Sequence, residues 1–172
     1  MKFLKEVLNF YINASIHVAL AVYAMVKVTE LYFVLPNNES LGFFVFFGTI
    51  TGYNFVKYAG VAKLHHRSLT NNLKIIQVFS FICFVLLCYY AWKIPFKTLL
   101  FLTPLVLITI LYAIPFLSGF QKNLRNVTHL KIIVVALVWA VFTVLLPLFN
   151  VDKPFSLTVY LTVIQRFLLV IV

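Results

Sequence analysis

Polar residues on one face of an otherwise apolar stretch are the first feature of this sequence that could do chemistry. Thr51, Asn54 and Tyr58 follow a three-then-four spacing, so they share one face of a helix, with Lys57 beside them. A cation and polar groups are costly in lipid, which predicts that this face points into a bundle interior or a wet cavity. Alternatively, Lys57 extends its stem to the membrane surface, and Tyr53 and Tyr58 lie at the interface. Spacing alone leaves both interpretations open.

Two basic loops are expected on the same side of the membrane as the end of this helix, at about 63–72 and 112–131. A phosphate or diphosphate could bind there, because arginine offers a fork of donors and lysine a point charge. The alternative is that inner loops are basic in any membrane protein of this kind, and the charge pattern by itself favours that alternative. The cations concerned are Lys63, Arg67, Lys122, Arg125 and Lys131.

Composition indicates the kind of element that must position these residues. Of 172 residues, 63% are hydrophobic and only 10% are charged, and the mean hydropathy is +1.04. A soluble domain has close to half apolar and about a quarter charged residues, so we expect an all-α, polytopic, integral membrane protein. The net charge is +10, but the cations lie between apolar runs. They are therefore expected to meet membrane lipids, and nucleic-acid binding is not expected.

A single domain over residues 1–172 is expected to contain about six transmembrane helices, since each crossing takes about 20 mainly apolar residues. Their predicted ranges are about 8–35, 41–62, 73–92, 96–117, 130–149 and 155–172. Cations concentrate on the side of the N-terminus, which predicts a cytoplasmic N-terminus. Pro104 and Pro115 could kink a helix and open a cavity toward that side, or they could be packing irregularities.

Carboxylates are scarce in this sequence. Glu6, Glu30, Glu39 and Asp152 are the four acidic residues, and none lies in either basic loop. Because Mg²⁺ needs one or two carboxylates beside the phosphate oxygens, no magnesium site can be assembled from these loops.

The order of these features resembles the UbiA-type intramembrane prenyltransferase superfamily, particularly its divergent bacterial members. The resemblance spans about Phe43 to Pro147, and it is carried by GTITGYNFVKYAG at 48–60, LYAIPF at 111–116 and KNLRNVTHLK at 122–131. It implies a helix bundle around a cavity in the bacterial inner membrane. It also implies transfer of a prenyl group from an isoprenoid diphosphate to a lipophilic or aromatic acceptor, with Mg²⁺ held by two aspartate-rich motifs.

Several residues match the family pattern, and others are missing. Asn54 matches the asparagine that opens the first motif, but the motif's aspartates are absent. By the same resemblance, Tyr112 and Lys122 would help to bind diphosphate, and Arg67 matches an arginine after the first motif. Arg125 joins this predicted diphosphate group from the basic cluster, and Thr51, Lys57 and Tyr58 are predicted to line the cavity.

The second aspartate-rich motif would follow Arg166, close to where the sequence ends. We therefore expect this chain to be the front part of a UbiA-like protein, with the ligands for Mg²⁺ not present in it. The alternative from a different class is a small non-catalytic membrane bundle, such as an accessory subunit, a lipid-binding protein or a transporter-like protein.

Overall fold

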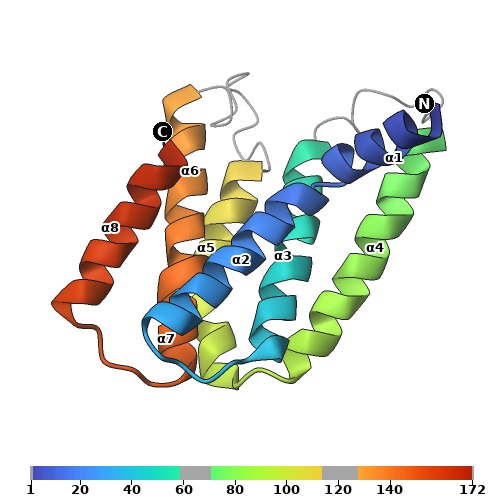
Figure 1. Cartoon of the computed structure of the whole chain (residues 1–172). Helices are drawn as coiled ribbons and strands as arrows, with labels where there is room; N and C mark the ends of the chain where they lie inside the picture. Colours follow the sequence, from blue (N-terminus) through green and yellow to red (C-terminus); the bar gives the residue numbers. More distant parts are fainter. Residues whose placement is uncertain (1, 59–70, 114–127, 172) are drawn as a thin grey trace.

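Helices make up all the regular structure in the part of the chain that the structure describes. The computed structural model describes residues 2–58, 71–113 and 128–171 (Figure 1). Since α6, η2 and α7 follow one another without a break, the described elements amount to seven helices, which confirms the all-helical prediction. In chain order they are α1 (Lys2–Asn13), α2 (Ile16–Tyr32), α3 (Glu39–Tyr58), α4 (Asn71–Trp92), α5 (Phe96–Ala113), α6 (Thr128–Ala140), η2 (Val141–Leu145), α7 (Leu146–Asn150) and α8 (Leu157–Ile171).

Length and composition support two to three membrane spans among the described residues, against the six expected. Leu73–Trp92 and Ile132–Asn150 are each long and apolar enough to cross a membrane. A third span results if α1 and α2 are counted together, although they are bent by 60° relative to each other. The apolar helices Phe96–Ile110 and Leu157–Ile171 are shorter. The polar residues in the second half of α3 make it less apolar than these helices.

The single first helix expected over 8–35 is interrupted. The helix breaks between Asn13 and Ile16, and Ser15 adopts a left-handed backbone with φ of 60°, which is uncommon for a residue other than glycine. α1 also begins earlier than expected, at Lys2. Its apolar residues share one face and its polar residues the other, a pattern typical of a helix that lies along a membrane surface.

The helix expected over 130–149 is also irregular, because it contains the π turn η2. This turn ends two residues before Pro147, which has no N–H to donate to the carbonyl of Thr143. The backbone N–H of Leu146 instead bonds the carbonyl of Val141, five residues back. A π turn of this kind often marks a functional region of a helix.

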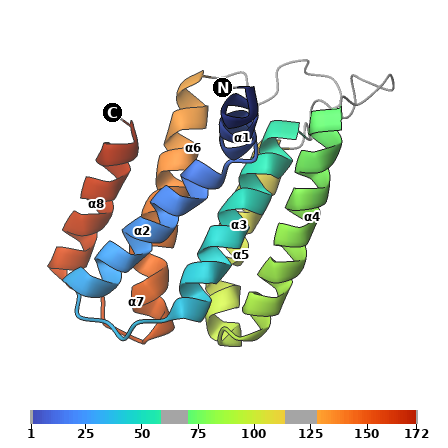
Figure 2. The same cartoon turned by 45° about the vertical axis from the view of Figure 1, so that its right-hand side comes forward.

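The helices form a bundle with two distinct ends. α3 packs along both α2 and α4, and α8 packs along α6. The turns after α2, α4 and α7 gather at one end, the turn end, and both chain termini lie toward the opposite end, the terminal end (Figures 1 and 2).

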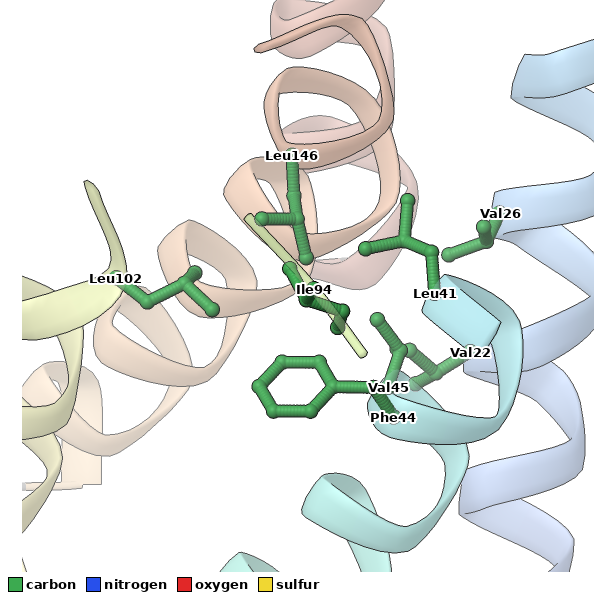
Figure 3. Packing of buried hydrophobic residues seen from close by; sticks show 8 residues of the cluster. All are labelled: Val22, Val26, Leu41, Phe44, Val45, Ile94, Leu102 and Leu146. Carbon is green, nitrogen blue, oxygen red and sulfur yellow. The ribbon is translucent and has the colours of Figure 1, made fainter. Parts of the chain in front are cut away.

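The main apolar core joins α2, α3, the turn after α4, α5 and α7 toward the turn end. Figure 3 shows its buried side chains, which are Val22, Val26, Leu41, Phe44, Val45, Ile94, Leu102 and Leu146. α2 and α3 approach closely at Gly42, where an added Cβ would lie 2.7 Å from Cε2 of Tyr23. A larger residue at this helix crossing would therefore require the ring of Tyr23 to move.

Aromatic residues and a cation mark the turn after α4. Trp92 is 92% exposed, and the ammonium of Lys93 lies 4.5 Å from the ring centroid of Tyr89. A side-chain hydrogen bond with Tyr89 raises the pKa of Lys93. Amphipathic rings beside a lysine are typical of the membrane–water interface.

Candidate functional site

A large cavity lies between α3, α4, α5 and α6, and we call it the α3–α6 cavity. Its volume is about 1010 Å³, at the upper end of the range for small-molecule sites. Gly48 and Tyr58 both line it, and they lie about 15 Å apart along α3 at 1.5 Å per residue. The cavity therefore follows the bundle axis over a considerable part of its length.

The lining of the α3–α6 cavity changes character along that axis. Lys57, Tyr58 and Gln77 line it toward the terminal end, where α3 finishes and α4 begins. Deeper in the bundle the lining is apolar, and it includes Phe84, Leu87, Val106 and Phe142. Such a space is suited to a molecule with a polar head and a long apolar tail.

The structure brings together four of the residues singled out from the sequence. Thr51, Asn54, Lys57 and Tyr58 all line the α3–α6 cavity. The ammonium of Lys57 and the hydroxyl of Tyr58 both donate to the carbonyl oxygen of Asn13, at 3.2 and 3.0 Å. That carbonyl belongs to the last residue of α1, where the helix dipole is negative. The two side chains therefore both line the cavity and hold α1 against α3.

Asn54 connects three helices through its amide group. Asn54 is 3% exposed, and its Oδ1 accepts a hydrogen bond of 2.9 Å from the hydroxyl of Ser15. Its Nδ2 donates to the hydroxyl of Ser80 at 2.8 Å and to the carbonyl of Ala14 at 3.2 Å. Both amide protons are thus engaged, so Asn54 would have to give up a bond to donate to a diphosphate. Its role in diphosphate binding stays a prediction.

Thr51 and Gly52 are neighbouring lining residues of the α3–α6 cavity, and they differ in what they offer it. The hydroxyl of Thr51 is buried and has no hydrogen-bond partner within the described part of the chain. Leaving such a group unpaired costs about 1–3 kcal/mol. At Gly52, which also lines the cavity, an added Cβ would meet nothing within 4 Å.

A hydrogen bond joins opposite walls of the α3–α6 cavity. The indole Nε1 of Trp139, on α6, donates to the hydroxyl of Tyr53, on α3, at 3.1 Å. Both residues line the cavity, and Trp139 lies two residues before η2. Sequence reasoning missed Trp139 as a site residue. The signal that could have found it is a single indole in an otherwise aliphatic helix, since a buried indole N–H needs an acceptor.

The remaining predicted diphosphate residues lie outside what the structure describes. Arg67, Lys122 and Arg125 fall between the described ranges, and Tyr112 belongs to α5 although its side chain is not described. The predicted phosphate cluster of two basic loops therefore stays a prediction.

The donor set of the α3–α6 cavity does not fit Mg²⁺. Within residues 2–58, 71–113 and 128–171, no three His, Cys, Asp or Glu residues lie together as a metal site. Glu30 pairs with Lys27 at 2.7 Å and Asp152 pairs with Lys97, and no carboxylate lines the cavity. A magnesium ion in a phosphate site needs at least one carboxylate, which this cavity does not offer.

Comparisons with protein-family models, with curated proteins and with solved structures find no match for this chain. The resemblance drawn from the sequence therefore stays a prediction. Inference about function has to start from the α3–α6 cavity and the residues around it.

Proposed function

We propose that this chain is a UbiA-like integral membrane protein that binds an isoprenoid diphosphate in the α3–α6 cavity. The apolar tail would lie deep, against Phe84 and Leu87, and the anionic head would lie at the terminal end beside Lys57. The single observation that carries this proposal is the change from polar to apolar lining along one cavity of about 1010 Å³.

The orientation of the protein follows from the same proposal. With the N-terminus cytoplasmic, the terminal end and Lys57 face the cytoplasm, where a soluble diphosphate is delivered. The amphipathic α1 would then lie along the cytoplasmic surface of a bacterial inner membrane, with Lys5 toward the lipid head groups. Six membrane crossings would place the turn after α4, with its exposed Trp92, at the opposite surface.

Prenyl transfer is the reaction that the resemblance implies. Lys57 would attract the diphosphate and stabilise the charge that develops on it as the bond to the prenyl carbon breaks. The apolar walls would keep water away from the reacting carbon. Because no carboxylate lines the cavity, the proposed charge stabilisation comes from Lys57.

A second candidate function is lipid binding without catalysis, as in an accessory or carrier protein. The observation that favours it is the absence of any carboxylate from the cavity lining. The two candidates share the same ligand and the same cavity, so one series of experiments can separate them.

Tryptophan fluorescence gives a direct binding test, because this chain contains two tryptophans. Trp139 lines the α3–α6 cavity, whereas Trp92 is exposed at the turn end. In the Trp92→Phe variant, titration with farnesyl diphosphate should therefore change the emission of Trp139. The matched control, Trp139→Phe, keeps Trp92 and should show no change.

Two further ligands separate the contributions of head and tail. Farnesol has the tail without the diphosphate, and inorganic pyrophosphate has the head without the tail. Farnesyl diphosphate should bind more tightly than either, and Lys57→Gln should remove its advantage over farnesol. The proposal fails if the emission of Trp139 does not respond, or if Lys57→Gln binds both prenyl ligands as the unaltered chain does.

Mass spectrometry of lipid-soluble products then distinguishes the two candidates. Incubation with farnesyl diphosphate, Mg²⁺ and a bacterial lipid extract should yield a prenylated product if the chain is an enzyme. Binding without any product would support the non-catalytic candidate.

A further inference from the structure

A second cavity lies between α2 and α8, and we call it the α2–α8 cavity. Its volume is about 250 Å³, and its polar lining comes from Thr29 and Tyr32 of α2 and from Thr162, Gln165 and Arg166 of α8. It shares no lining residue with the α3–α6 cavity. Thr29 and Tyr32 belong to the last turns of α2, toward the turn end, whereas Arg166 and Leu169 belong to the second half of α8, which runs toward the terminal end (Figure 2).

Arg166 is the charged residue that lines the α2–α8 cavity, and its guanidinium lacks an anionic partner among the described residues. Its Nε is buried and has no hydrogen-bond partner in the described ranges. Arginine stays protonated in proteins, so this is a buried N–H of a charged group. Arg166 lies about 14 Å along α8 from Leu157, within an apolar helix, at 1.5 Å per residue. An unpaired cation in such surroundings is costly, and an anion beside it would remove much of that cost.

No carboxylate of the chain takes this place in the structure. Glu30 is the neighbour of Thr29 on α2, but its Oε2 pairs with the ammonium of Lys27 at 2.7 Å. Asp152 pairs with Lys97, and none of the acidic residues lines the α2–α8 cavity. Among the described residues, Arg166 therefore has no carboxylate partner, and its guanidinium is free to take an anionic ligand.

The other polar groups of the α2–α8 cavity limit what that anion can be. The hydroxyls of Thr29 and Thr162 donate to carbonyls of their own helices, those of Met25 and Thr158, at 3.0 and 2.8 Å. The guanidinium of Arg166, the amide of Gln165 and the hydroxyl of Tyr32 supply donors to the cavity. A planar fork of N–H groups with further donors beside it suits a tetrahedral phosphate group.

We propose that the α2–α8 cavity binds the phosphate group of a membrane lipid. The surface beside it is apolar, since Val28, Leu31 and Leu169 are each at least half exposed. Acyl chains can cover these side chains while the head group reaches Arg166. The site shares no lining residue with the α3–α6 cavity, so it is separate from the proposed isoprenoid site.

Three matched ligands test the proposal on the full chain in detergent micelles: dioctanoyl phosphatidic acid, dioctanoylglycerol and inorganic phosphate. Binding is measured by native mass spectrometry and by the shift in the thermal unfolding midpoint. Phosphatidic acid should bind and stabilise the chain, whereas dioctanoylglycerol, which has the same tails without the phosphate, should not. Stabilisation by inorganic phosphate alone would still support the anion site but would assign it to a free anion.

Two variants locate the effect at Arg166. Arg166→Gln should weaken phosphatidic acid binding about tenfold, because a charge-assisted fork is lost. The control Lys97→Gln removes a cation that does not line the α2–α8 cavity and should leave binding unchanged. If Arg166→Gln does not fold, Gln165→Leu keeps the guanidinium and should weaken binding about fivefold through one neutral hydrogen bond.

Several results would overturn the site. They are equal binding of phosphatidic acid and dioctanoylglycerol, binding that is unaffected by Arg166→Gln, and an equal loss of binding in Lys97→Gln. If Arg166→Gln does not fold, unchanged binding of phosphatidic acid by Gln165→Leu would also overturn the site.

Discussion

Gly52 offers the sharpest perturbation of the α3–α6 cavity. It lies inside α3 and lines the cavity, and an added Cβ there would meet nothing within 4 Å. Glycine inside a helix costs about 0.5–1 kcal/mol relative to alanine. Gly52→Ala should therefore raise the free energy of unfolding by about that amount, because the new methyl group has room.

A larger side chain at Gly52 should separate stability from binding. Gly52→Leu puts four carbon atoms into the space proposed for the isoprenoid tail. If the tail loses the burial of two or three methylene groups at about 0.8 kcal/mol each, the loss is about 2 kcal/mol, or roughly thirtyfold in Kd. The variant should still fold as stably as the unaltered chain, because the leucine occupies space that is open in the structure.

Gly42 is the matched control on the same helix. An added Cβ at Gly42 would lie 2.7 Å from Cε2 of Tyr23, in the packed contact between α2 and α3. Gly42→Ala should therefore lower the free energy of unfolding by about 1–3 kcal/mol through overpacking.

Chemical denaturation in mixed micelles, followed by circular dichroism, measures the three stabilities. Trp139 fluorescence in the Trp92→Phe background measures Kd for farnesyl diphosphate. The reasoning is refuted if Gly52→Ala destabilises the chain as much as Gly42→Ala does. It is also refuted if Gly52→Leu folds and binds farnesyl diphosphate with unchanged Kd.

Three further predictions concern the polar contacts. Asn54→Ala should lower the free energy of unfolding by about 1–3 kcal/mol, because it removes the partner of the buried Ser15 hydroxyl and Ala14 carbonyl and of the partly buried Ser80 hydroxyl; Thr103→Val, on an exposed face, should change it by less than about 0.5 kcal/mol in the same denaturation assay. Lys57→Gln should raise the Kd for farnesyl diphosphate about tenfold while that for farnesol stays unchanged, since a charge-assisted contact affects only the anionic head; equal effects on both ligands in the fluorescence titration would contradict this. Lys97→Gln breaks the pair with Asp152, whose side chains are 45% and 73% exposed, so the loss of stability should stay below about 1 kcal/mol; a larger loss would mean that this pair is not a solvent-screened contact.

Many of the helix boundaries could be read from local sequence. The end of α4 at Trp92 and the start of α5 at Phe96 were predicted at these residues, since Lys93 and Pro95 interrupt two apolar runs. The break between α1 and α2 was not predicted, because the residues around Ser15 read as part of one apolar run. Ser15 in this break is hydrogen-bonded to the side chain of Asn54, which is 39 residues away in the sequence. The residues near Ser15 cannot predict such a distant partner.

The residues of the two cavities were also predicted only in part from the sequence. Helical spacing placed Thr51, Asn54, Lys57 and Tyr58 on one face, since side-chain direction in a helix follows from sequence position alone. Helical spacing could not predict that Asn54 bonds Ser15 and Ser80, or that Trp139 bonds Tyr53. It also could not predict that the Nε of Arg166 has no hydrogen-bond partner in the described part of the chain. Those outcomes depend on which helices become neighbours and how closely they approach. The sequence by itself therefore determined most of the helices and the polar face of α3, and only tertiary packing decided where the first helix breaks and which faces enclose a hollow.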